Sequence, residues 1–300
     1  MALDSDSLRR MKTFVSPQSF ITRCLFVFVV SNANAFAGYT FTTLDDPLAP
    51  IQPNMGTQAY AISGSRVVGE YADINHHYHG FLFNGRVYRS IDDPLGAFAT
   101  GACGISGRKI VGYYRNSQGA HGFLVKKGKY TTLDVPFRDV SQTFANGIDG
   151  NKIVGIYRDN RGFHGFLLSN NAYKNIDVPF GGTYDTFAYG ISGTKIVGYY
   201  SSADGRFHGF VFDGQTYTRI DPPGSDQTEL TGIDGNTLVG SYRDAQETFH
   251  GFVFDGSSYK TIDVPSANQT HVYAISGGKI AGWYRGSGYR FHGFTATPTR

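Results

Sequence analysis

The sequence predicts an all-β protein built from repeated four-stranded units, and three observations support this. Glycine supplies 39 of the 300 residues, aromatic residues reach 15% and charged residues only 17%, below the usual ~25%. Short runs rich in Tyr, Phe and Val between Gly, Asn and Asp are typical of strands and turns. The tripeptide His-Gly-Phe recurs six times at intervals of 42 to 44 residues. A segment near the N-terminus matches the part that the last repeat lacks.

Residues 1–37 differ from the rest of the chain and have the features of a secretory signal. Basic residues precede an apolar run over 24–30, and Ala35-Phe-Ala37 has the small-x-small pattern of a signal peptidase site. A membrane anchor is the alternative, but seven strongly apolar residues are far fewer than the ~20 needed to span a bilayer. We expect cleavage before Gly38, translation from Met1 or Met11, and a secreted or periplasmic mature protein.

Cleavage changes the charge of the protein. Removing four Lys/Arg and two Asp leaves 23 basic residues against 22 acidic residues, a net charge of +1. This charge is too small to favour nucleic acid as a partner. No segment after the signal is apolar enough to span a membrane. Cys103 remains as a single cysteine, so no internal disulfide is expected.

Each repeat holds four strand-like segments in the same order. An opening Thr is followed five residues later by Ile, as in Thr143 and Ile148. A Val-Gly-x-Tyr segment comes next, as in 154–157, and then the His-Gly-Phe segment. The last segment ends in Asp-x-Pro, as in 173–179. Turn sequences such as Asn84-Gly85 and Asp213-Gly214 separate the segments and favour hairpins.

The third segment predicts how the units pack. Residues 210–212 and 252–254 are hydrophobic at every position, so such a strand must be covered on both faces. Radially stacked sheets provide this cover, and ~40–45 residues per four-stranded unit is typical of a propeller blade.

The ends of the chain indicate how the ring would close. The sixth repeat stops soon after His292 and lacks its fourth segment, whereas residues 38–47 match the fourth segment at 85–94. The N-terminal strand would complete the last blade and hide two exposed edges. We therefore predict a monomeric six-bladed β-propeller over residues 38–300, with four antiparallel strands in each blade.

The repeats resemble the HAF-type repeats of extracellular bacterial proteins, which join a Val-Val-Gly strand to a His-Ala-Phe strand. Here the triplet is His-Gly-Phe, and an Ile-Asp-x-Pro element stands where those repeats usually have Leu-Gly-Gly. The resemblance covers nearly all of residues 38–300. It implies export and a propeller-like fold, and it implies no reaction.

A Tyr, a His and an Asp recur in every unit, as in Tyr200, His208 and Asp221. They could form six acid/base sites or six sugar sites between blades. A polar residue repeated at one place in every blade most simply satisfies buried hydrogen bonds. We therefore interpret these residues as structural.

A site is expected where the repeat is broken, along the strand that lines the central channel. The residues after the opening Thr form a first variable column, listed as Gln58, Gly101, Phe144, Phe187, Glu229 and His271. A second column two residues later reads Tyr60, Cys103, Asn146, Tyr189, Thr231 and Tyr273. A third, in the next strand, reads Glu70, Tyr113, Ile156, Tyr199, Ser241 and Trp283.

Polar departures gather in the fifth, sixth and first units. We predict a ligand site at the channel mouth where each inner strand begins, formed by Gln58, Glu70, Phe144, Phe187, Glu229, His271 and Trp283. If Glu229 pairs with His271, the pKa of the imidazole should rise.

Other chemical signals are weaker. His76-His77-Tyr78-His79 resembles a metal-binding tract, but no Cys or carboxylate set accompanies it. Cys103 has no distinctive His partner, so a packed thiol is favoured over a nucleophile. No phosphate loop, Gly-x-Ser-x-Gly or calcium loop occurs, and we expect no cofactor or metal.

Two functions remain open. The first is a non-catalytic binding module for a glycan or protein partner, and we favour it. The alternative is an extracellular hydrolase or lyase that uses Glu229 and His271.

Overall fold

The computed structural model describes residues 35–36 and 38–299, and this part of the chain contains strands and turns but no helix. The all-β prediction is confirmed. The predicted signal segment, residues 1–37, lies almost wholly outside the described residues, so its cleavage stays a prediction. Ala35–Phe36 form a short strand, β1, that pairs with the following strand.

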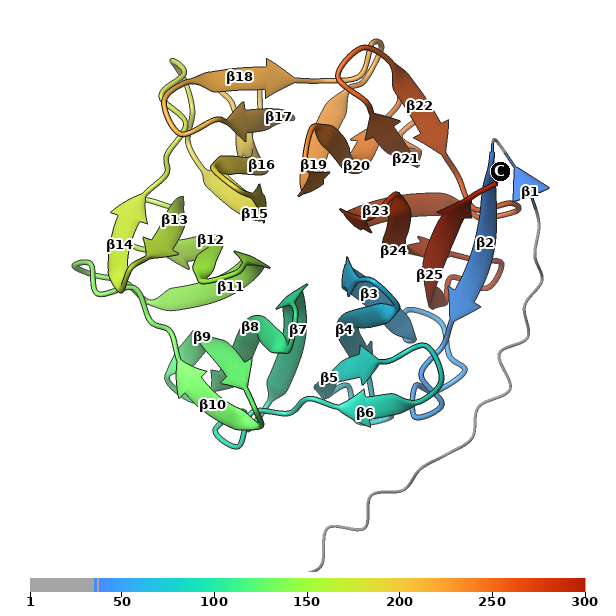
Figure 1. Cartoon of the computed structure of the whole chain (residues 1–300), viewed down its shortest axis with the longest axis horizontal. Helices are drawn as coiled ribbons and strands as arrows, with labels where there is room; N and C mark the ends of the chain where they lie inside the picture. The colour runs from blue at the N-terminus through green and yellow to red at the C-terminus, as the bar shows by residue number, and fades with distance from the viewer. Residues whose placement is uncertain (1–34, 37, 300) are drawn as a thin grey trace, which may run out of the picture.

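The strands are arranged in six units around a central opening (Figure 1), and β1 adds a fifth strand to the last unit. We call each unit a blade and number the blades 1 to 6 along the chain. The innermost strands are β3 (Thr57–Ser63), β7 (Ala99–Ser106), β11 (Gln142–Asp149), β15 (Thr186–Ser192), β19 (Gln227–Asp234) and β23 (Gln269–Ser276). The second strands are β4 (Arg66–Ala72), β8 (Lys109–Asn116), β12 (Lys152–Arg158), β16 (Lys195–Ser201), β20 (Thr237–Arg243) and β24 (Lys279–Arg285).

The outer half of each blade follows the same order. The third strands are β5 (Tyr78–Phe83), β9 (Gly119–Lys126), β13 (Phe163–Ser169), β17 (Phe207–Phe212), β21 (Phe249–Phe254) and β25 (Phe291–Pro298). The outermost strands are β6 (Tyr88–Ser90), β10 (Lys129–Thr132), β14 (Ala172–Asn175), β18 (Tyr217–Ile220), β22 (Tyr259–Ile262) and, in blade 6, β2 (Tyr39–Leu44).

Hydrogen bonding groups these strands into five sheets. Blades 3, 4 and 5 are separate four-stranded sheets, and blade 6 has the order β1-β2-β25-β24-β23. Blades 1 and 2 count as one eight-stranded sheet because a single parallel pair, Tyr78 with Ala99, joins β5 to β7. Strand β2 pairs antiparallel with β25 from Tyr39–Pro298 to Leu44–Gly293. This is the pairing that the offset in the sequence predicts.

The His-Gly-Phe phenylalanines form the centre of each blade. All six are essentially inaccessible to water, namely Phe81, Phe123, Phe166, Phe210, Phe252 and Phe294. The glycine of the Val-Gly segment makes room for this ring. A Cβ on Gly155 would lie 2.0 Å from the carbonyl oxygen of Phe144 and 2.8 Å from the ring of Phe166. A larger residue there would therefore separate two paired strands.

The antiparallel order gives the molecule two different faces. The turns after the innermost strands, and those after the third strands of blades 1 to 5, lie on one face, which we call the turn face. The connections between second and third strands, and between successive blades, lie on the opposite face, which we call the loop face. The inner strands begin at the loop face and end at the turn face.

Candidate functional site

The repeated histidines connect strands within their own blades. Each His Nδ1 lies 2.7 to 3.2 Å from a carboxylate oxygen of the Asp that follows the outermost strand. Each imidazole also packs on the repeated tyrosine of the second strand, at ring-centre distances of 5.0 to 5.6 Å. In blades 3, 4 and 5 the other oxygen of the Asp accepts the glycine N–H of His-Gly-Phe. This geometry supports a structural role.

A second carboxylate faces several of these histidines. Nε2 of His164 lies 3.1 Å from Asp159, and Nε2 of His250 lies 3.2 Å from Asp244. Burial opposes a charge on His250, but hydrogen bonds to Asp263 and Asp244 outweigh it and raise its pKa.

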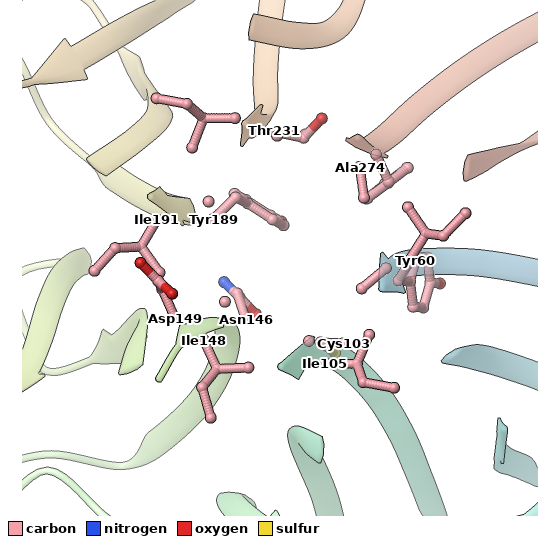
Figure 2. Close-up of a pocket in the computed structure, with 18 of the residues that line it drawn as sticks. Tyr60, Cys103, Ile105, Asn146, Ile148, Asp149, Tyr189, Ile191, Thr231 and Ala274 are labelled. Carbon is pink, nitrogen blue, oxygen red and sulfur yellow. The ribbon is translucent and has the colours of Figure 1, made fainter. Parts of the chain in front are cut away.

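A cavity of about 420 Å³ occupies the centre of the ring toward the turn face (Figure 2). Its lining repeats with the blades. Residues of the second variable column form its inner end, and one isoleucine from each inner strand forms its wall, listed as Ile62, Ile105, Ile148, Ile191, Ile233 and Ile275. The last residues of the inner strands form its rim, listed as Ser63, Ser106, Asp149, Ser192, Asp234 and Ser276.

A β-bulge in every inner strand lies at the inner end of the cavity. The pairing of first and second strands skips one residue, and that residue is in each case the member of the second column. The skipped residues are Tyr60, Cys103, Asn146, Tyr189, Thr231 and Tyr273, and all six line the cavity. Bulges commonly redirect side chains near functional sites.

Polar contacts between blades position several lining residues. Asn146 Nδ2 donates to the Ala188 carbonyl at 3.0 Å, and Thr231 Oγ1 donates to the Val272 carbonyl at 2.8 Å. At the rim, Asp149 and Asp234 accept the turn N–H groups of Gly193 and Gly277 in the next blades, and Ser106 and Ser192 accept similar bonds. The rim is therefore braced across four junctions.

Behind the cavity, tyrosine hydroxyls contact a buried acid. Tyr60 lies 2.7 Å from Gln58 Oε1 and 2.9 Å from Glu70 Oε1, and Tyr113 donates to Glu70 Oε2 at 2.8 Å. Burial raises the pKa of Glu70, although both tyrosine hydrogen bonds lower it. One hydroxyl proton cannot serve both Gln58 and Glu70. A protonated Glu70 would donate to Tyr60 and satisfy both contacts.

Gly101 of the first column is explained by the same acid. A Cβ at this position would lie 2.5 Å from Glu70 Oε2 and 2.4 Å from the Tyr113 ring. The departure from the repeat in blade 2 therefore makes room for the carboxyl that blade 1 supplies.

The predicted pairing of Glu229 with His271 is absent from the residues that the structure describes. His271 stacks on Trp283 at 4.0 Å and packs on Phe249 at 4.6 Å. Burial, and secondarily the charge of Arg285, lower its pKa to about 3. The expected rise is therefore wrong, because aromatic rings rather than a carboxylate surround the imidazole. Burial raises the pKa of Glu229 to about 7.

The structure does not bring the predicted residues into one cavity. Phe144 lines the central cavity, and Gln58 and Glu70 contact the tyrosines behind it. Phe187 packs against Phe163, Tyr199 and Phe207. Trp283 lies between His271 and Phe291. The predicted site left out the second variable column, whose six residues all line the cavity. Their variation from blade to blade was the feature of the sequence that could have identified them.

The Cys103 thiol and the possible metal ligands have no arrangement that indicates reactivity among the described residues. Cys103 is partly buried, with Sγ 3.8 Å from the Gly101 carbonyl, and burial raises its pKa well above the ordinary value. Within residues 38–299, His, Cys, Asp and Glu form no group of three or more that could hold a metal ion. No helix long and apolar enough to cross a membrane occurs among the described residues.

Comparison with known proteins finds solved structures but no family model and no curated protein that matches the sequence. A mutant of AofleA from Arthrobotrys oligospora is 10% identical, with a TM-score of 0.53 over 90% of this chain and 97% of that one. The SapL1 lectin in complex with α-methyl fucoside is 12% identical, with a TM-score of 0.52 over 79% and 89%. The β-propeller domain of the Trilobed protease from Pyrococcus furiosus is 10% identical, with a TM-score of 0.50 over 80% and 93%.

The chain has a β-propeller fold. At these identities the likeness extends to the fold alone.

Proposed function

We propose that this protein is a non-catalytic glycan-binding module. In this proposal the chain is exported after loss of residues 1–37 and folds as a closed six-bladed propeller, with β2 as the outer strand of blade 6. One structure of similar fold is a lectin in complex with α-methyl fucoside, which supports a sugar as the ligand. A protein partner is the alternative ligand class.

The central cavity is the observation that carries the proposal. Tyr60, Tyr189 and Tyr273 lie at its inner end, and serine and aspartate side chains lie at its rim. The hydroxyls of Tyr60 and Tyr189 are engaged by Gln58, Glu70 and Tyr199, which leaves their rings to form an apolar surface. Sugar rings present apolar C–H faces and a periphery of hydroxyl groups. Aromatic rings combined with a few placed polar groups suit such a ligand.

Plugging the cavity tests the proposal. Ser63 and Ser276 line the rim and make no side-chain hydrogen bond among residues 38–299, so Ser63→Trp and Ser276→Trp fill the entrance and leave the bracing intact. We expect at least a tenfold loss of affinity for the sugars that a glycan array identifies. Thr194→Trp places the same ring on an exposed turn of the same face and should bind normally.

The residues predicted at the loop-face mouth provide the contrasting result. Glu229→Gln and His271→Ala should retain sugar binding if the ligand occupies the cavity. Binding that is lost in these two variants and retained in both tryptophan variants would place the ligand at Gln58, Glu229 and His271 instead.

An extracellular hydrolase or lyase remains the second candidate, because a carboxyl with a pKa of about 7 could serve as a general acid. It predicts product release from a bound oligosaccharide and its loss in Glu229→Gln. Chromatography of array-positive sugars after long incubation with the wild type tests this. Unchanged sugars would support the binding module.

A further inference from the structure

Blade 2 carries a row of lysines that the other blades lack. Lys129 of β10 pairs directly with Lys126 of β9, and Lys126 pairs directly with Lys109 of β8. In-register residues of neighbouring strands project from the same face of a sheet, with strands ~4.8 Å apart. Three ammonium groups therefore project side by side at the turn face, and Lys127 follows in the turn itself.

The row breaks the repeat. Five residues after the His of His-Gly-Phe, blade 2 has Lys126, whereas the other blades have Asn84, Ser169, Asp213, Asp255 and Thr297. Opposite this position, blade 2 has Lys129 where blade 3 has Ala172. Asp213 and Asp255 accept N–H groups of their own turns and so stabilise them. Blade 2 has Lys126 at this position, and its ammonium group cannot accept these hydrogen bonds.

The lysines are placed at some cost to the fold. Like charges directly opposite on neighbouring strands repel each other. Lys127 has a φ of 53°, a left-handed conformation that a lysine side chain disfavours, and blade 3 has Asn170 at the same place with a φ of 51°. Neither feature helps the hairpin to form. A role outside the hairpin accounts for both.

No acid among the described residues forms an ion pair with this surface. Lys126, Lys127 and Lys129 are exposed and make no ion pair or side-chain hydrogen bond among the described residues. Lys109 donates to the Gly150 carbonyl and to Asn151. Arg86 and Arg108 lie in neighbouring turns of blades 1 and 2 and Arg66 begins β4, all three without an ion pair among the described residues. The described acids in the turns of this face belong to other blades, listed as Asp149, Asp213, Asp234 and Asp255.

We propose that the lysine row of blade 2, Lys109, Lys126, Lys127 and Lys129, binds an acidic polysaccharide that carries carboxylates along its chain. This inference rests on the proposed function, because the central cavity opens on the same face. A row of ammonium groups suits a polymer with a charge on successive sugar rings, and the neighbouring cavity would accept one of its sugars.

Nucleic acid and membrane surfaces are less suited to this face. Base stacking needs exposed aromatic rings, and membrane insertion needs exposed apolar side chains. The exposed large hydrophobic residues lie in connections of the loop face or, for Tyr78, at the strand end there, and are listed as Leu48, Ile51, Ile74, Tyr78, Leu95, Phe98, Tyr184 and Tyr289. On the turn face, therefore, the lysine row can attract a partner by its charge but has no exposed large hydrophobic side chain beside it.

The test copies the hairpin of blade 3 into blade 2. Lys126→Ser, Lys127→Asn and Lys129→Ala install residues that the same fold carries at equivalent positions, so folding should be preserved. Binding to polygalacturonate is measured by calorimetry on residues 38–300, with fully methyl-esterified polygalacturonate as the uncharged ligand. We expect the triple variant to lose affinity for the acid polymer at least fivefold, and wild-type affinity to fall with added salt.

A matched control removes three charges elsewhere. Lys174→Ala, Lys260→Ala and Lys279→Ala lie in blades 3, 5 and 6 and should bind as the wild type does. Equal binding of acid and esterified polymer, or equal loss in both triple variants, overturns the lysine row and leaves sugar binding standing. Wild-type protein that binds no glycan overturns the proposed function itself. Tighter binding to duplex DNA or to phosphatidylglycerol vesicles than to polygalacturonate overturns the choice of partner.

Discussion

Two buried carboxyls in the channel differ in their partners. Glu70 accepts a hydrogen bond from Tyr113 and contacts Tyr60, which lowers its pKa against the effect of burial. Burial alone accounts for the shift of Glu229, whose pKa rises to about 7. Burial and hydrogen bonding therefore act in opposite directions on the pKa of Glu70, whereas burial acts alone on the pKa of Glu229.

Glu229 should make stability depend on pH. Its pKa is about 7 in the folded protein against an ordinary value of 4.5, so the folded state holds an extra proton between these values. Stability then falls as pH rises from about 4.5 to 7, by on the order of 3 kcal/mol in total. We expect Glu229→Gln to unfold at a higher temperature than wild type at pH 8, with little difference at pH 4.

The exposed Glu247 provides the control for this prediction. Thermal unfolding of Glu247→Gln should follow the wild type at both pH values. A Glu229→Gln protein that follows it too would show that the carboxyl is solvated in the channel.

At the scale of elements, the repeat predicts nearly every strand, because period, turn residues and apolar alternation agree in each unit. The site was less predictable. The sequence identifies Gln58 and Tyr60 as alternate residues of one strand, but it does not reveal the bulge at Tyr60. It also does not reveal which end of the channel is open. That depends on where the tyrosine rings lie, which is a matter of packing between blades.

The histidines belong to this scale, since each connects two strands. His164 is mostly buried and contacts Asp177 at 2.8 Å and Asp159 at 3.1 Å. We expect His164→Ala to lower the free energy of unfolding by about 1–3 kcal/mol, because it removes one hydrogen-bond partner from each of two carboxylates. Urea denaturation measures this, and sugar binding at low temperature should be unchanged.

His77→Ala removes an exposed histidine of a loop and should have little effect on either quantity. Loss of binding by a His164→Ala protein of wild-type stability would mean that the repeated histidines are sites after all.

At the scale of the whole molecule, the two ends of the chain meet in blade 6. Strand β2 contributes Phe41 and Leu44 to the core, with 5% and 3% of their surfaces exposed, and the Asp45 that follows it contacts His292. A protein that starts at Pro47 loses these contacts and exposes the edge of β25. We expect its unfolding free energy to fall by on the order of 5 kcal/mol or more relative to a protein that starts at Gly38.

Guanidinium denaturation of the two truncated proteins measures this difference. Equal midpoints would show that the ring does not depend on its N-terminal strand.

The six bulges have a consequence for how the protein could change its ligand. A bulged residue is skipped by the ladder, so replacing it removes no backbone hydrogen bond between the first and second strands of its blade. Six such positions face one chamber, and at present they hold three tyrosines, a cysteine, an asparagine and a threonine. The isoleucines and phenylalanines that hold the blades together lie elsewhere along the strands. The side chain at each bulge can therefore change one blade at a time, and with it the lining of the chamber, while the pairing of the first and second strands stays the same.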